Sequence, residues 1–344
     1  MYCRYQFQFI AITLFLLPAL TIFGVSDSLV FAATPVDVSP VTPRNTKTEA
    51  DQLLQKGTDQ YRKGEFQNAL ETYQQVLAIR RQLGDKKGVA ETLNNIGEVY
   101  TDMGAYEKAM VVLQEALTIN RETGDRRSHS HTLNLLGLVN RGFDKLAQAM
   151  QLHQQALQIA KTEGDRAGIG ESLHNIAAVY AEQGQYAKAL EFYQEARKIR
   201  NEVGDRRDLG RTLNNMGGVY YNLGEYPRAL EFYQQALAIR REIGDRAGVG
   251  RLLNNMGLTY RKLGKNSQAL IYFQQAIVML EAIGDRISVG RLLNNMGAIY
   301  ESLSQIPKAL ESYQQALEIA QQIGDKAGET QALESIKRLN GKNP

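Results

Sequence analysis

Residues 244–283 read GDRAGVGRLLNNMGLTYRKLGKNSQALIYFQQAIVMLEAI, and this forty-residue unit decides the fold. Its opening Gly-Asp pair recurs through the chain at intervals of forty residues, without insertion or deletion. The pair stands at 84–85, 124–125, 164–165, 204–205, 244–245, 284–285 and 324–325. A long period kept in strict register is typical of repeat architectures, in which similar units stack and bury their apolar faces against one another.

Each unit contains two runs of apolar residues with helical spacing. The first run follows the spacing i, i+3, i+4, i+7 and consists of Leu253, Met256, Gly257 and Tyr260. A second run of the same kind, in the preceding unit, consists of Ala229, Leu230, Tyr233, Ala236 and Leu237. This spacing places the apolar residues on one face of a helix, so each unit is predicted to be a helix–turn–helix hairpin.

The Gly-Asp pair has a mechanical role between successive helices. We expect the glycine to end one helix in a left-handed conformation and the aspartate to cap the next helix by accepting its free N–H groups. Small residues such as Gly257 and Ala236 are expected where the two helices of a hairpin cross closely. In the third unit, Asn140 and Asp144 replace the usual tyrosine and turn glycine, and we expect a local irregularity there.

The resemblance to a known family is carried by Leu253-Asn254-Asn255-Met256-Gly257-Leu258-Thr259-Tyr260, followed by Gly264, Ala269, Phe273 and Ala276. This pattern resembles the tetratricopeptide repeat, in the forty-residue form found in kinesin light chain and Pins/LGN proteins. The resemblance implies an all-α fold, a right-handed α-solenoid of helix–turn–helix repeats. Seven repeats are expected over residues 49–327, followed by a C-terminal capping helix and tail over residues 328–344.

The N-terminal residues 1–33 are predicted to be an export signal. Arg4 precedes an uncharged apolar run at residues 9–25, and small residues at Ala32 and Ala33 offer a cleavage site. The protein is therefore expected to be periplasmic or secreted. The alternative is an uncleaved signal anchor that holds the protein to the membrane by residues 9–25. Residues 34–48 hold three prolines and are predicted to be an extended linker.

Composition argues against several classes of function. The formal net charge of +3 is too small a surplus to indicate binding to nucleic acid, or to a membrane surface unless the signal is an uncleaved anchor. The single cysteine, Cys3, lies in the predicted signal, so the mature chain has no thiol for a disulfide or a metal. No nucleophile motif, phosphate loop or set of metal ligands is present. We therefore expect no catalytic site, no metal and no cofactor.

The first helix of each unit carries a second stripe that points away from its packing face. Positions 91, 95, 98 and 102 lie within about 60° of one another on a helix. By the family resemblance this stripe lines a concave groove that holds extended peptides. Asparagines at one position of the stripe are predicted to bind a peptide backbone with both their donor and their acceptor. They are Asn95, Asn175, Asn215, Asn255 and Asn295.

An alternative role for asparagine is to join neighbouring repeats by hydrogen bonds. Asparagine is disfavoured within helices by about 0.6 kcal/mol relative to alanine, so some interaction has to stabilise it there. The joining role suits the adjacent column better, because those side chains point to the flank. This column contains Asn94, Asn134, Asn214, Asn254 and Asn294.

The predicted groove is also polarised in charge. Acidic residues lie in its N-terminal part, at Glu91, Glu98, Asp102, Glu171 and Glu182. Three arginines occupy one repeat position in its C-terminal part, at Arg211, Arg251 and Arg291. Arginine binds carboxylates in a bidentate manner, so this row is predicted to hold an acidic segment or a free C-terminus of a partner. The alternative is that each arginine pairs with a junction aspartate such as Asp245 or Asp285 and braces the stack.

These observations predict a non-enzymatic scaffold that binds a partner protein or peptide in its groove. The alternative is a structural spacer that self-associates or separates other components without a dedicated peptide ligand. The identity of the partner does not follow from the fold, because one repeat architecture serves many unrelated functions.

Overall fold

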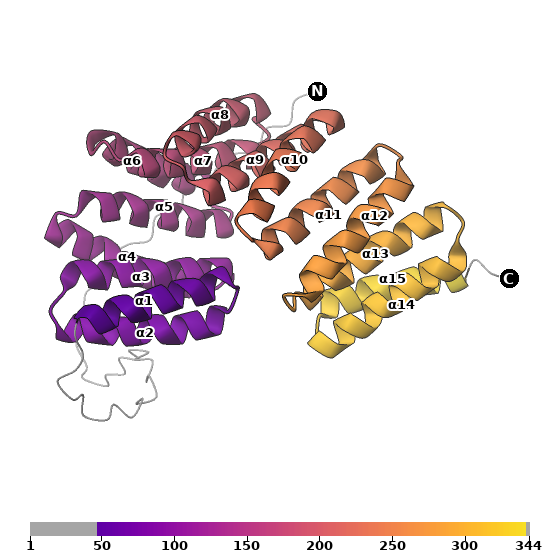
Figure 1. Ribbon diagram of the computed structural model, residues 1–344, viewed down its shortest axis with the longest axis horizontal. Coiled ribbons are helices and arrows are strands. Elements are labelled where there is room, and N and C mark those ends of the chain that lie inside the picture. The colour runs from indigo at the N-terminus through magenta and orange to yellow at the C-terminus, as the bar shows by residue number, and fades with distance from the viewer. Residues whose placement is uncertain (1–46, 342–344) are drawn as a thin grey trace, which may run out of the picture. The chain divides into compact units, whose positions relative to one another are not determined.

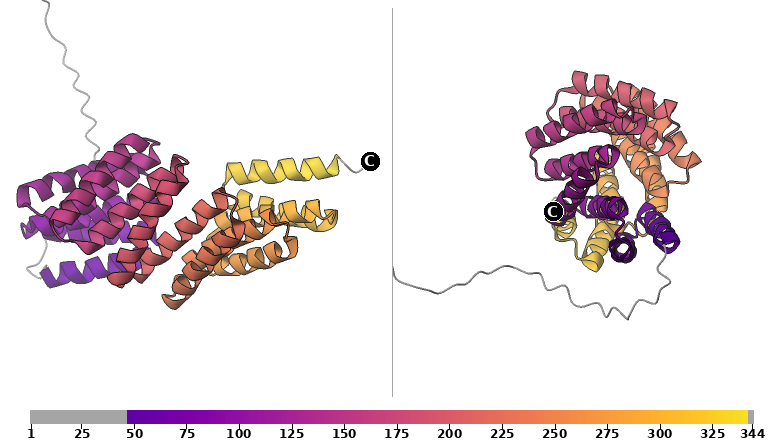
Figure 2. Two further views of the ribbon diagram at one scale, coloured as in Figure 1. Left: turned by 90° about the horizontal axis from the view of Figure 1, so that it is seen from above. Right: turned by 90° about the vertical axis from the view of Figure 1, so that its left-hand side faces the viewer.

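The computed structural model describes residues 47–341, which form fifteen α-helices and contain no strand (Figure 1). Consecutive helices pack pairwise as hairpins, and the hairpins follow one another in chain order (Figure 2). This arrangement confirms the predicted all-α solenoid of helix–turn–helix repeats. The predicted signal at 1–33 and almost all of the predicted linker lie outside the described residues. No helix within 47–341 has both the length and the apolar character needed to cross a membrane.

Seven helical hairpins and one additional helix make up the solenoid. The hairpins consist of α1 (Lys47–Arg62) with α2 (Phe66–Gln82), α3 (Lys86–Asp102) with α4 (Tyr106–Thr123), α5 (Arg126–Gly142) with α6 (Leu146–Thr162), α7 (Arg166–Glu182) with α8 (Tyr186–Glu202), α9 (Arg206–Asn222) with α10 (Tyr226–Glu242), α11 (Arg246–Lys262) with α12 (Asn266–Glu281), and α13 (Arg286–Ser302) with α14 (Ile306–Ile323). The additional helix is α15 (Lys326–Asn340), which packs on α14. We number the repeats one to seven by these hairpins.

The junctions between repeats have the predicted geometry. Each junction glycine is in the left-handed region, with φ of 69° at Gly244 and 73° at Gly284. Each junction aspartate accepts a hydrogen bond from the backbone N–H three residues later, as Asp245 does from Gly248 at 2.8 Å. The same bond is present at Asp85, Asp125, Asp165, Asp205, Asp285 and Asp325. A left-handed C-terminal glycine followed by an aspartate cap therefore fixes the angle between repeats at every junction.

The turn within each hairpin also needs a left-handed residue, and two repeats meet this need without glycine. Asp144 has φ of 58° and Ser304 has φ of 56°, where the other repeats have glycine. The expected irregularity of repeat three is wrong, because the backbone hydrogen bond of this turn, from Lys145 N–H to the carbonyl of Asn140, is kept at 2.8 Å. Asp144 keeps the regular turn by adopting the left-handed backbone conformation, which is unfavourable for residues that have a side chain. The replacement of glycine by Asp144 is therefore present as local backbone strain.

Replacing Asp144 and Ser304 by glycine is expected to stabilise the protein. Each change relieves a left-handed conformation that disfavours L residues, and the greater freedom of glycine in the unfolded chain offsets part of the gain. We expect a rise of about 0.5–1 kcal/mol in the free energy of unfolding per substitution, measured by urea denaturation. Gly264→Ala is the matched reverse change, since its new Cβ would meet nothing within 4 Å and strain alone would act. Equal stability of all three variants would contradict this account.

In six of the seven hairpins, a buried side chain at the centre of the second helix packs on a glycine of the first helix. A Cβ placed on Gly257 would lie 2.5 Å from Cε1 of Phe273, and one on Gly297 would lie 2.6 Å from Cε1 of Tyr313. Position 257 is therefore a glycine because it accommodates the ring of Phe273. The small residues Gly257 and Ala236 were expected at a close crossing of helices, and the structure shows that at Gly257 the neighbour is this ring. In repeat four, Ala177 takes the glycine position beside a tyrosine.

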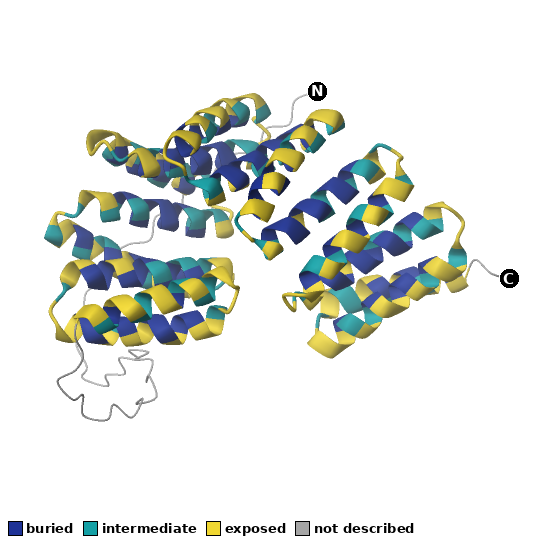
Figure 3. Cartoon of the chain, in the orientation of Figure 1, coloured by how far each residue is buried: buried dark blue, intermediate teal, exposed yellow. Residues whose placement is uncertain are grey.

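The solenoid has two exposed sides, and the buried residues lie between them. Buried residues form stripes where helices face their neighbours, while the turns and the second helices carry most of the exposed residues (Figure 3). First helices also contact the first helices of the next repeat, as α3 does with α5 and α5 with α7. We call the exposed side of the first helices the inner surface and that of the second helices the outer surface.

Candidate functional site

The inner surface brings charged residues of distant repeats within electrostatic range of one another. Burial lowers the pKa of the Arg211 guanidinium on α9, but Asp208 outweighs this effect, and Glu98 on α3 and Tyr61 on α1 raise the pKa further. Glu98 belongs to a hairpin three repeats earlier in the chain. This interaction over three repeats agrees with first helices that curve toward one another, and we call the inner surface between them the groove.

The Asn94 column joins successive first helices. The carboxamide of Asn94 on α3 accepts a hydrogen bond from Thr132 Oγ1 on α5 at 2.8 Å. Asn134 Nδ2 on α5 donates to Ser172 Oγ on α7 at 2.9 Å. Both asparagines are buried, with 3% and 0% of their surface exposed. These bonds agree with the joining role expected of this column, because each amide bridges two repeats.

The residues of the Asn95 column, which were predicted to bind peptide, differ in their burial and hydrogen bonds. Asn95 and Asn295 are half-buried, and neither forms a side-chain hydrogen bond within residues 47–341. Asn215 Nδ2 lies 3.3 Å from Nε2 of His174, and Asn255 Nδ2 donates to Asn214 Oδ1 at 3.0 Å. These two amides take part in joining repeats, so only a part of their hydrogen-bonding capacity faces the groove.

Asn175 differs from the rest of its column. Its side chain is buried, with 3% exposed, and Nδ2 has no hydrogen-bond partner among the described residues. A ligand in the groove does not reach a buried side chain without movement of the protein. We therefore leave Asn175 out of the candidate site, although the sequence placed it there.

The N-terminal part of the groove is a network of acidic side chains. Tyr61 Oη donates to Asp102 Oδ2 at 2.7 Å, and His131 Nδ1 lies 3.2 Å from both carboxylate oxygens of Glu171. Burial lowers the pKa of His131, but Glu171 and then Glu98 outweigh it and raise the pKa to about 9. Burial raises the pKa of Glu98, opposed by His131. A protonated His131 is thus paired with Glu171 of the next repeat and lies in the field of Glu98 of the preceding repeat.

The arginine row of the C-terminal part is not uniform. Arg211 Nη1 pairs with Asp208 Oδ1 at 3.0 Å, on the same helix. Arg251 and Arg291 are exposed, and neither forms an ion pair or hydrogen bond with any described residue. Two of the three predicted arginines are therefore available to a ligand, while Arg211 is held by acidic groups of the protein itself.

Buried arginines at the junctions are structural residues that the sequence analysis missed. Arg240, at the end of α10, forms an ion pair with the junction residue Asp245, so Asp245 has a partner on the preceding helix, while Arg251 acts on Asp245 only electrostatically. Arg200 donates to the carbonyl of Asp208 at 2.9 Å, and Arg80 donates to that of Gly88 at 2.8 Å. A signal was present, because arginine recurs at this repeat position in repeats one, four and five.

Two buried histidines were also missed as structural residues. His153 is fully buried at the position where other repeats have Tyr73, Tyr193 or Phe273, and its Nδ1 lies 3.0 Å from Asn134 Oδ1. His174 occupies the Asn94 column, with Nδ1 3.2 Å from Thr212 Oγ1. Within the part of the chain that the structure describes, no group of three or more His, Cys, Asp or Glu side chains is arranged to hold a metal.

Comparison with solved structures supports the fold. A Rap protein complexed with competence and sporulation factor aligns with a TM-score of 0.64 and 17% identity, over 80% of this chain and 76% of that chain. The Rap conjugation gene regulator of plasmid pLS20, in complex with the Phr* peptide, gives 0.63 and 17%, over 86% and 80%. BtubC (BKLC) from P. vanneervenii gives 0.52 and 19%, over 63% and 92%. No curated protein matches the sequence.

A family model for the tetratricopeptide repeat matches residues 49–122, 89–162, 128–202, 208–282 and 248–322. These overlapping segments span well over half of the chain and fall on the helical hairpins described above. The chain belongs to the tetratricopeptide repeat family.

Proposed function

We propose that the protein is an interaction scaffold whose groove binds an acidic segment or the free C-terminus of a partner protein, at repeats six and seven. The observation that carries this proposal is the state of Arg251 and Arg291. Both guanidinium groups are exposed on the inner surface and form no ion pair or hydrogen bond with a carboxylate within residues 47–341, whereas Arg211 does. In the same proposal, residues 1–33 direct this scaffold out of the cytoplasm.

Amides beside the two arginines add a means of holding a peptide backbone. Asn255 and Asn295 each follow their arginine by four residues, so one turn of helix brings amide and guanidinium to the same side. Asn295 offers both donor and acceptor, and Asn255 offers its carbonyl oxygen, since its Nδ2 already donates to Asn214. A ligand carboxylate at the arginines and a ligand backbone at the amides make use of both groups.

The charge distribution of the groove orients such a ligand. Glu98, Asp102 and Glu171 form the opposite, acidic part, where a bound carboxylate would be repelled. An acidic segment is therefore expected at repeats six and seven rather than in repeats two to four. Two structural neighbours are themselves described as complexes with a factor or peptide, which supports a peptide as the class of ligand.

Reversing charge at both arginines tests the proposal. Peptides are selected from an unbiased synthetic library on the full-length protein, and the binding of the selected peptides, which are expected to have an acidic C-terminal segment, is measured by fluorescence anisotropy. Arg251→Glu with Arg291→Glu is expected to weaken binding of the selected peptides by at least about tenfold, because two charge-assisted contacts become repulsive. Amidation of the peptide C-terminus distinguishes a free carboxylate from acidic side chains.

The matched control is Arg246→Glu with Arg286→Glu. These residues lie at the first positions of the same two helices, are exposed, and give the same change in net charge. Equal weakening by both pairs, or selection of peptides without acidic residues, would contradict the proposal. If no peptide binds and Asn255→Ala with Asn295→Ala merely lowers the melting temperature, the spacer alternative is the better description.

A further inference from the structure

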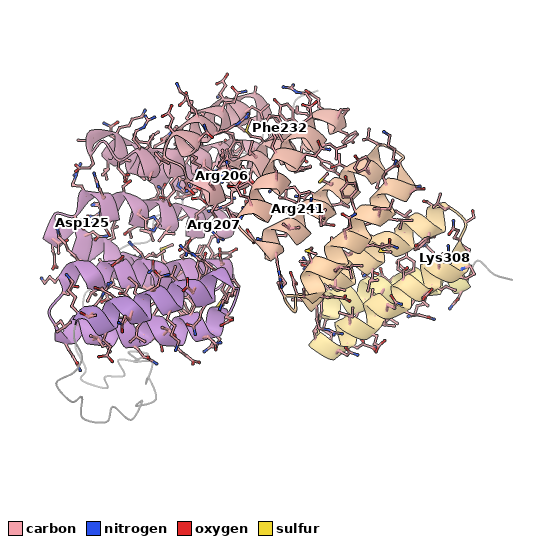
Figure 4. All side chains as sticks on the ribbon, viewed as in Figure 1. Asp125, Arg206, Arg207, Phe232, Arg241 and Lys308 are labelled. Atoms are coloured by element: carbon pink, nitrogen blue, oxygen red, sulfur yellow. The ribbon has the colours of Figure 1, made fainter. Side chains whose placement is uncertain are left out.

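The outer surface contains a crevice between the second helices of repeats five and six. Its floor is formed by Leu237 of α10 and Met256 of α11, which are 8% and 1% exposed. Ile271 and Tyr272 of α12 form one wall, and Arg241 and Gln275 stand at its rim. We call these six residues the outer crevice; Figure 4 labels Arg241. Apart from Met256, the residues of the outer crevice belong to second helices.

The equivalent rim in repeats one and two is closed by an ion pair. Arg81 occupies the position of Arg241 in repeat one, and it pairs with Glu115 of the next second helix at 2.6 Å. In the outer crevice, the position of Glu115 is taken by Gln275. Arg241 consequently has no carboxylate partner in the described part of the chain. The rim of the outer crevice therefore lacks the glutamate that pairs with the equivalent arginine in repeats one and two.

The wall of the crevice is apolar where most other repeats are charged or polar. Ile271 is 52% exposed, and Val278, two turns further along α12, is 58% exposed. The position of Ile271 is taken in repeats one, four, five and seven by Glu71, Glu191, Glu231 and Glu311. Exposure of two large aliphatic side chains on one stripe of a helix is unfavourable in water unless another surface covers them.

The outer crevice combines two features, an arginine that has no carboxylate partner and an apolar wall. The same pair of rim residues, Arg121 and Gln155, stands at the equivalent positions of repeats two and three, but Gln151 takes the wall position there. That rim therefore has the charge without the apolar surface. It serves below as an internal control.

We propose that the outer crevice binds an amphipathic helix of a partner protein, with apolar residues packed against Ile271 and Val278 and a carboxylate paired with Arg241. The charge at the rim selects this occupant, because a cation without an acid favours an acidic flank on the partner. A crevice between two second helices fits a helix that lays its apolar face along it. This interaction does not depend on the groove function proposed above.

The test uses two designed helical peptides and measures their binding to the full-length protein by fluorescence anisotropy. One peptide has leucines along one face and glutamates along its flank, and the other has lysines in place of the glutamates. The glutamate peptide is expected to bind, and the lysine peptide is expected to bind at least about tenfold more weakly. Gln275→Glu supplies Arg241 with the acid that repeat two has, and is expected to weaken binding of the glutamate peptide by about tenfold.

Two further variants complete the test. Ile271→Glu introduces the residue of four other repeats and is expected to abolish binding without lowering the melting temperature, because the side chain is exposed. Gln155→Glu makes the same change as Gln275→Glu at the equivalent position of repeat three and is expected to leave binding unchanged.

Three results would overturn the proposal. The first is that the glutamate peptide does not bind, and the second is that it binds the Gln275→Glu variant and the original protein with equal affinity. The third is that sedimentation shows a dimer of the original protein that Gln275→Glu dissociates. The last result would assign the crevice to a second copy of the chain. The Arg251→Glu and Arg291→Glu pair is expected to leave this binding intact, so failure here and failure of the groove proposal are distinguishable.

Discussion

Phe273→Ala is expected to lower the free energy of unfolding by about 3–5 kcal/mol, a loss at the upper end for a single core substitution. The ring is fully buried and belongs to the largest core cluster, which joins repeats five to seven. It lies on Gly257, so no side chain from the first helix is able to fill the space that truncation leaves. Urea denaturation followed by circular dichroism measures the loss.

Two companion variants separate packing from other effects. Phe273→Leu is expected to cost about 1 kcal/mol, because leucine at the equivalent position, Leu113, already packs on Gly97 in repeat two. Val278→Ala, on the same helix but exposed, is expected to change stability by less than about 0.5 kcal/mol. A loss below about 1 kcal/mol for the alanine variant would show that the ring is not central to the hairpin.

The stability of the protein is expected to fall as the pH drops below about 6.5, and His153 is one cause of this fall. Burial, with a smaller effect of Arg141, lowers the pKa of His153 to about 3. In the unfolded chain the same imidazole takes up a proton near its ordinary pKa. The unfolded state therefore binds more protons than the folded state between the two values, and stability rises with pH across that window.

The expected size of this effect follows from the linkage. Each pH unit below the unfolded pKa costs about 1.4 kcal/mol per such histidine, so His153 alone accounts for about 2 kcal/mol at pH 5. His174 acts in the same direction, because burial and then Arg200 and Arg211 hold its pKa well below the ordinary value. Both contributions are fully present above about pH 6.5 and are lost progressively on acidification.

Removing the imidazole tests this assignment. His153→Phe places in repeat three the residue that repeat six has, and the free energy of unfolding of this variant is expected to depend less on pH between about 7 and 5. His129→Gln is the control, since His129 is only half-buried and its replacement is expected to leave most of the slope in place. An unchanged slope in His153→Phe would exclude this histidine as the origin of the acid sensitivity.

The architecture was predictable because it depends on local rules repeated in register. The Gly-Asp junction fixes a left-handed residue and a helix cap from two adjacent letters, and helical spacing fixes the packing faces. The same reasoning failed at Asp144, where a missing glycine was taken to mean an irregular turn. The neighbouring repeats impose the turn, and Asp144 adopts the left-handed conformation that they require.

The candidate site was less predictable, because side-chain partners depend on the geometry between repeats. Sequence spacing places Asn215 and Asn295 at the same position of the stripe. It does not show that Asn215 lies against His174 while Asn295 stays unbonded, although Asn255 bonds the asparagine at the equivalent place in the preceding repeat. Arg211 and Arg251 differ for a local reason that was readable from the sequence, because Asp208 stands three residues before Arg211 and Gly248 stands three residues before Arg251.

Because each junction between repeats is held by local hydrogen bonds, the number of repeats is able to change during evolution without disturbing the other junctions. Every hydrogen bond of a junction cap lies within a few residues of its Gly-Asp pair, as between Asp245 and Gly248. Loss or duplication of one whole forty-residue segment in the gene would leave all remaining caps complete and require no new loop. A chain with this junction is thus able to lengthen or shorten in steps of one hairpin.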